Sequence, residues 1–115
     1  MPEPLGTVEA AELPDGRHLV SAHGPLDRRV APLLHETLVP LVAAEGIPLI
    51  LDLVDAHGLD HETLGVVRSA AQLANQQGER LSIVTRSPSI TRLFEATGLG
   101  ELVSVFPTLR EALEP

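Results

Sequence analysis

The positions of apolar and polar residues change period along the chain, and this change predicts the elements. Two short runs near the start, residues 5–13 and 17–23, fit strands, and Pro14-Asp15-Gly16 between them indicates a turn, so the pair is expected to form a hairpin. Gly24-Pro25 is expected to break the second strand. Three further strands are predicted at residues 47–54, 80–85 and 102–106, and the first is apolar enough to be buried on both faces.

Four helices are predicted between and after these runs, because apolar residues recur there every three or four positions. The first has its apolar face between Val30 and Val42. We expect Asp27 to cap it, Pro40 to kink or shorten it, and Gly46 to end it.

The other three helices have clear local boundary signals. The second is expected to begin near Asp60 and stop at Gly78, after a polar loop over residues 55–62. The remaining signals are Ser87-Pro88 at the start of the third helix, Gly98 at its end, and a capping box of Thr108 and Glu111 at the start of the fourth.

The predicted order, β-β-α-β-α-β-α-β-α, indicates an α/β fold. Helices between successive strands imply a mixed, mostly parallel sheet, here of about five strands with four helices. The length of 115 residues and the absence of a dividing linker indicate one domain, with a core over about residues 5–113.

Composition excludes several kinds of function. The net charge of −8 opposes nucleic-acid binding, and Phe94 and Phe106 are the chain's only aromatic residues. The absence of cysteine excludes disulfides and thiolate chemistry. No apolar run is long enough to span a membrane, and the acidic start lacks a signal peptide's basic region, so a cytoplasmic protein is expected.

The sequence gives little support for a metal site or for catalysis. His57 and His61 are four residues apart, with Asp55, Asp60 and Glu62 nearby, but Gly58 and the predicted loop argue against a shared helix face. No nucleophile elbow and no glycine-rich phosphate loop is present. We therefore expect no enzyme activity, no metal and no cofactor, and surface positions for His18, His23 and His35.

Four local motifs resemble the STAS domain family, of the bacterial anti-sigma-factor antagonist type. The most diagnostic runs from Ser87 to Leu99 and resembles the family's Ser-Pro-x-Val-x-Arg-Leu-Phe-Glu-x-x-Gly-Leu. The others are Gly24-Pro25-Leu26-Asp27, Leu51-Asp52-Leu53 and the run from Leu59 to Val67, which lies where the family has Met-Asp-Ser-Ser/Thr-Gly-Leu-Gly-Val-Leu.

The resemblance implies a regulatory module that binds proteins. In such antagonists a kinase that is also an anti-sigma factor phosphorylates the second serine of this last motif, and phosphorylation blocks binding. Ungapped alignment puts His61 at the first serine, Glu62 at the phosphorylated serine and Thr63 at the glycine, while Asp60 and Gly65 are kept. The resemblance therefore implies a partner-binding surface made of Asp27, Asp60, His61, Glu62, Thr63 and Gly65.

Two interpretations of Glu62 remain open. Its carboxylate carries about one negative charge, against roughly 1.5 to 2 for a phosphoserine, so it either mimics the phosphorylated state or marks a loss of kinase control. Thr63 is a less favoured substitute phosphosite, since one position along a helix is a rotation of about 100°.

Two classes of partner follow from the resemblance and from the predicted sheet. The first is a protein, either an anti-sigma factor with serine kinase activity or another STAS protein. The alternative is a small ligand or nucleotide, bound at the carboxyl ends of the strands near Asp27, Asp52 and residues 55–62.

Overall fold

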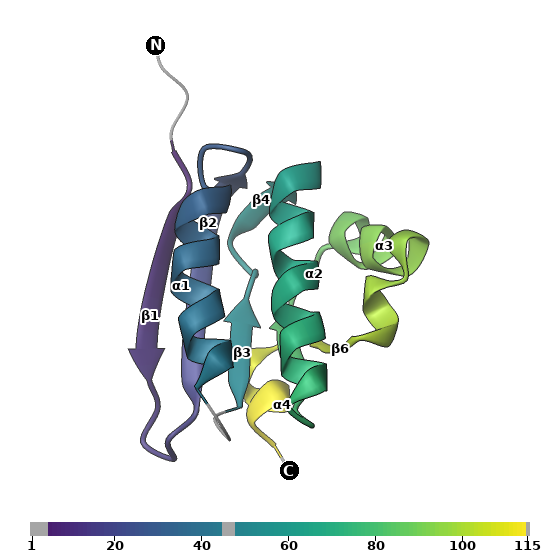
Figure 1. The fold of residues 1–115 in the computed structure, drawn as a ribbon. Helices are drawn as coiled ribbons and strands as arrows, with labels where there is room; N and C mark the ends of the chain where they lie inside the picture. Colours follow the sequence, from purple (N-terminus) through teal and green to yellow (C-terminus); the bar gives the residue numbers. More distant parts are fainter. Residues whose placement is uncertain (1–4, 45–47, 115) are drawn as a thin grey trace.

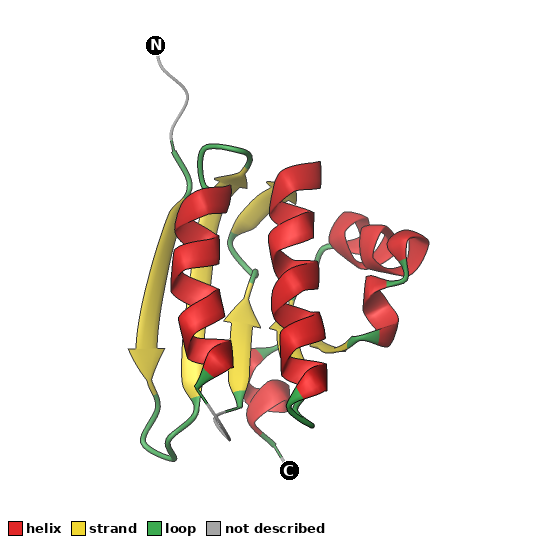
Figure 2. Cartoon of the chain, viewed as in Figure 1, coloured by secondary structure: helices red, strands yellow, loops and turns green. Residues whose placement is uncertain are grey.

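The computed structural model describes residues 5–44 and 48–114. The described chain forms one layered α/β unit in which α1 (Ala31–Ala43) and α2 (His61–Gln76) lie side by side on one face of a sheet (Figures 1 and 2). The predicted α/β class, with its hairpin and four helices, is confirmed. The predicted stop at Gly46 and the first residue of the predicted strand 47–54 lie outside the described residues.

Over the described residues, the sheet contains six strands, one more than predicted. Its main order is β1-β2-β3-β5-β6, with β1 antiparallel to β2 and the other neighbours parallel. The strand bounds are Thr7–Glu12 for β1, His18–Leu26 for β2, Leu49–Asp52 for β3, Ala56–Leu59 for β4, Leu81–Val84 for β5 and Val103–Phe106 for β6.

The additional strand is β4, which lies where a loop was predicted. It pairs in parallel with the end of β2, and the register shifts between Gly24 and Leu26. The prediction that Gly24-Pro25 ends the second strand is therefore wrong. Gly24 has a positive φ of 78°, and its N–H donates to the Asp55 carbonyl at 2.9 Å, so the strand bends there and continues beside a new partner.

The core lies mainly between the sheet and the pair α1 and α2. Side chains from β2, β3 and β5, including Val20, Leu51 and Ile83, are fully buried against these helices. A smaller cluster forms on the opposite face, where α4 (Leu109–Leu113) covers Ile50 and Val84. Helices on both faces explain why β3 is almost continuously apolar.

Local capping signals set most helix boundaries as predicted. Ser87 and Thr108 each accept a hydrogen bond from the N–H three residues ahead, at the starts of α3 (Pro88–Thr97) and α4. Gly98 ends α3 with a φ of 77°, and a 3-10 turn, η1 (Leu99–Glu101), follows it. Pro40 does not stop α1, which continues to Ala43.

Candidate functional site

The start of α2 is joined to the end of β2 by main-chain and side-chain hydrogen bonds. The Asp60 N–H donates to the Leu26 carbonyl at 3.0 Å. The Asp60 side chain accepts the Thr63 N–H at 2.9 Å, which makes Asp60 the N-cap of a helix that the sequence predicts to begin near this residue. These bonds place the first turn of α2 directly beside the loop that leads from β2 to α1.

Thr63 strengthens the same connection from inside the protein. Its side chain is 0% exposed, and its hydroxyl donates to the Leu26 carbonyl at 3.0 Å, with the Asp27 carbonyl 3.3 Å away. A hydroxyl in this position is inaccessible to a kinase or to a partner in the folded state. The structure thus gives Thr63 a supporting role within the predicted surface.

Asp27 lies in the loop on the other side of this connection. Its carboxylate accepts the Arg29 N–H at 2.9 Å and the Arg29 guanidinium at 2.7 Å. The Arg29 side chain and main-chain hydrogen bonds hold the pKa of the Asp27 carboxyl below its usual value, so this charge persists to lower pH.

The prediction that Asp27 caps α1 is wrong. The capping position is Val30, which supplies no side-chain hydrogen bond. The Asp27 carbonyl instead accepts the N–H groups of Val30 and Ala31, because its side chain is already bonded to Arg29 in a tight turn before the helix.

Gly6 shows how closely this loop is packed. A Cβ atom on Gly6 would lie 2.5 Å from the Pro25 carbonyl oxygen and 2.9 Å from a methyl group of Val30. The segment before β1 can approach the loop only because residue 6 has no side chain. The loop that carries Asp27 is therefore held from two sides, by α2 and by the segment before β1.

Three of the predicted site residues are exposed at the start of α2: His61, Glu62 and Gly65. Glu62 lies in the first turn, where its negative charge interacts favourably with the helix dipole. Gly65 has open space around it, because a Cβ atom added there would meet nothing within 4 Å. Asp27, Asp60, His61, Glu62 and Gly65 thus form one accessible surface, which we call the α2-start surface.

The histidines are dispersed in the described structure. His57 lies in β4 and His61 at the start of α2, and the described ranges contain no group of three or more histidines and carboxylates placed to hold a metal ion. His23, for which the sequence suggested no partner, has its Nδ1 3.4 Å from a carboxylate oxygen of Asp55. That contact joins β2 to the turn before β4.

Two adjoining cavities lie away from the residues predicted for a small ligand. One, of about 400 Å³, lies between α3, η1 and β6, and the other, of about 480 Å³, lies at the end of β5. Neither is lined by Asp27, Asp52 or residues 55–62. Neither cavity was predicted from the sequence, although the alternating Val103 and Val105 are a weak signal for the first.

Comparisons with known proteins agree with the fold and the motifs. The sequence model of the STAS domain matches residues 10–112. The chain belongs to the STAS domain family. The curated anti-sigma-B factor antagonist of Bacillus subtilis is 35% identical to this STAS domain over 86 residues, which are 75% of this chain and 78% of the relative.

Solved structures resemble this STAS domain over most of its length. An anti-sigma factor antagonist from Mycobacterium paratuberculosis superposes with a TM-score of 0.83 and 27% identity, covering 95% of this chain and 92% of that one. The anti-sigma factor antagonist SpoIIAA in its unphosphorylated form gives 0.75 at 11% identity, covering 92% and 93%, and it supports the fold alone. In the described part of the STAS domain, no helix has the length and apolar character needed to cross a membrane.

Proposed function

We propose that this STAS domain is a non-enzymatic regulatory module that binds another protein through the α2-start surface. The partner is an anti-sigma factor with serine kinase activity or another STAS protein. Relatives named as anti-sigma-B factor antagonists, at 35% and 33% identity, support this class of partner. An exposed surface with several acidic groups suits a partner with a basic face.

Gly65 is the observation that carries the proposal. A glycine inside a helix costs roughly 0.5–1 kcal/mol relative to alanine. Gly65 has an ordinary helical conformation and open space around it, so packing within the described chain gives no reason for a glycine. A partner that approaches the helix closely at this point gives a reason for a residue without a side chain.

The proposal includes the absence of phosphorylation control at this surface. Glu62, at the position of the family's phosphorylated serine, has no hydroxyl, and its carboxylate is permanently charged at neutral pH. The hydroxyl of the adjacent Thr63 is buried and hydrogen-bonded. Partner binding is therefore independent of a phosphate at either position.

The proposal is tested by incubating the protein with ATP and the anti-sigma factor kinase of its own organism. Intact-mass spectrometry should show no added phosphate on the wild-type chain, while Glu62→Ser should gain one, because it restores the acceptor on an otherwise intact docking surface. A phosphate on Thr63 of the wild-type chain would contradict the absence of control. Failure of both chains to bind or react with the kinase would exclude it as the partner.

A further inference from the structure

The sheet ends at β6, which pairs only with β5 in the described structure. The Thr85 N–H donates to the Phe106 carbonyl at 3.0 Å, so the main-chain groups of Phe106 point toward β5. Successive residues of a strand point their main-chain groups to opposite sides. Those of Val103 and Val105 therefore point to the free edge.

Arg80 covers one part of this edge. Its guanidinium donates to the Val103 carbonyl at 2.9 Å and to the Glu101 carbonyl at 3.0 Å. This contact resembles the side-chain protection that natural edge strands often have. The Arg80 hydrogen bonds end at Glu101, Val103 and Ser104, so the N–H and carbonyl of Val105 remain as the accessible pair of main-chain groups on the edge.

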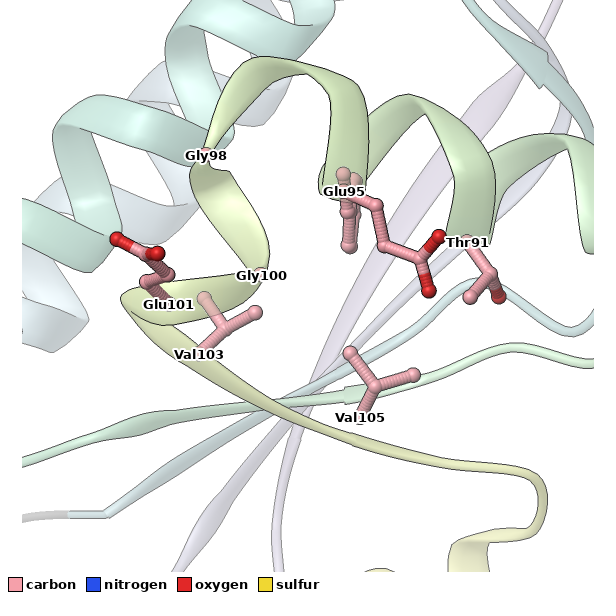
Figure 3. A pocket seen from close by; sticks show the side chains of 8 residues that line it. Thr91, Glu95, Gly98, Gly100, Glu101, Val103 and Val105 are labelled. Carbon is pink, nitrogen blue, oxygen red and sulfur yellow. The ribbon is translucent and has the colours of Figure 1, made fainter.

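The cavity of about 400 Å³ is lined by Val103 and Val105 of β6 and by residues of α3 and η1 (Figure 3). The side chains of Val103 and Val105 point toward α3 and form an apolar floor, and Val105 is 37% exposed. The Glu95 carboxylate lies between α3 and β6, close to Thr91. Glu95 forms no ion pair with any residue that the structure describes.

We propose that this groove binds an extended segment of a partner protein, which adds to β6 as a further strand. The segment bonds to the main chain of Val105, inserts an apolar side chain into the cavity, and pairs a lysine or arginine two residues along with Glu95. Side chains two residues apart lie on the same face of a strand, so one segment can satisfy both contacts. The domain's net charge of −8 also favours a basic segment.

The occupant is a peptide strand because the site presents main-chain groups as well as a carboxylate. A small organic cation would use Glu95 and the apolar floor but would leave the Val105 N–H and carbonyl unused.

This groove is separated from the α2-start surface by β3 and β5 in the sheet order. Binding here is therefore independent of the proposed function.

The direct test is a titration of the ¹⁵N-labelled full chain with the peptide acetyl-Thr-Val-Thr-Lys-Thr-amide, followed by NMR. The amide signals of Val105, Glu95 and Thr91 should shift. Glu95→Gln should weaken binding about threefold, the usual size of an exposed charge pair, and a peptide with Glu in place of Lys should bind correspondingly worse. Glu36→Gln, an exposed change on α1, should leave the affinity unchanged.

Val105→Pro tests strand addition itself. It removes the N–H that faces the edge without removing a donor to β5, a position where strands tolerate proline. Peptide binding should be lost, whereas Val105→Ala should keep most of it. The wild-type-like ¹⁵N spectrum of each variant checks folding, and Glu95→Gln remains as the test if Val105→Pro does not fold.

Several results would overturn the proposal. These are an absence of shifts at β6, shifts confined to the other edge strand β1, and equal shifts from n-butylammonium, which would indicate a small-cation site. Concentration-dependent dimerisation in sedimentation that Val105→Pro abolishes would assign the edge to a second copy of the chain instead.

Discussion

Thr63 occupies the place of a glycine in the family motif that the sequence resembles, and the structure turns the added side chain inward. Its hydroxyl satisfies main-chain carbonyls at the end of β2, while its N–H is capped by Asp60. A single side chain thereby connects the helix start to the neighbouring loop. The connection fixes the geometry of the α2-start surface without adding a group to it.

Thr63→Val should therefore destabilise the fold by about 0.5–1.5 kcal/mol, the usual net contribution of one hydrogen bond. Valine keeps the shape of threonine but removes the buried hydroxyl, so the hydroxyl contacts with the Leu26 and Asp27 carbonyls are lost. The Leu26 carbonyl still accepts the Asp60 N–H. Thr63→Ser, which keeps the hydroxyl, is the matched control and should cost less. Urea denaturation measures both, and equal stability of Thr63→Val and wild type would show that the bond contributes nothing.

The lowered pKa of Asp27 predicts how the contribution of this residue to stability depends on pH. The folded-state pKa of Asp27 is lowered from 3.8, so its contribution to stability is present above that value and is lost as pH falls through the lowered pKa. Arg29→Gln should raise the pKa of Asp27 toward 3.8, since the side-chain hydrogen bonds are the largest cause. Carboxyl ¹³C NMR titration measures it.

Arg28→Gln is the control for this titration, because Arg28 contributes only a minor charge interaction to Asp27. Its effect on the pKa of Asp27 should be the smaller of the two. An equal rise in both variants would mean that general charge, rather than the Arg29 hydrogen bonds, holds the carboxyl ionised.

At the scale of elements, α2 combines a buried face that supports the fold with an exposed start that the fold does not need. Its buried residues, such as Leu64 and Val67, pack against the sheet. Gly65 lies on the exposed side and weakens the helix, and no close packing contact requires a glycine there. The helix is thus less stable than its packing would allow.

Gly65→Ala should raise the free energy of unfolding by about 0.5–1 kcal/mol, because alanine loses less backbone entropy in a helix and meets no neighbour here. Gln72→Ala, another exposed change on α2, should alter stability by only a few tenths of a kcal/mol. Urea denaturation measures both variants. A destabilised Gly65→Ala protein would reveal an internal requirement for glycine and remove the main support for the proposed surface.

Elements with local signals were predictable from the sequence, and elements that depend on distant partners were not. Asp60, Ser87 and Thr108 cap their helices within three residues, so each boundary is encoded locally. The strand β4 contains His57 and Gly58 and has no apolar alternation. It forms because the end of β2 offers it a partner.

Some features of the candidate site were predictable from the local sequence, and others depend on contacts between distant segments. The exposure of Glu62 and the cap at Asp60 follow from their places in the first turn of a helix. The burial of Thr63 and the Arg29 contact of Asp27 depend on how the β2–α1 loop packs against α2. The groove beside Val105 depends on α3 and β6, which are brought together only in the folded domain.

At the scale of the whole molecule, two accessible surfaces lie at separate places on one sheet. The α2-start surface borders β2 and β4, and the groove borders the edge strand β6. Both carry carboxylates, in keeping with the net charge of −8. The two proposed interactions therefore use separate surfaces, and a basic partner is favoured at each.

We expect the protein partner to bind at the α2-start surface. The most direct measurement is affinity capture from native lysate of the source organism, with bound proteins quantified by mass spectrometry. Gly65→Arg should reduce recovery of an anti-sigma factor kinase or STAS partner about tenfold, because it places a large side chain in the contact. Gln76→Arg, which introduces the same side chain and charge at the exposed far end of α2, should leave recovery unchanged. Equal recovery with Gly65→Arg and with wild type would contradict this expectation.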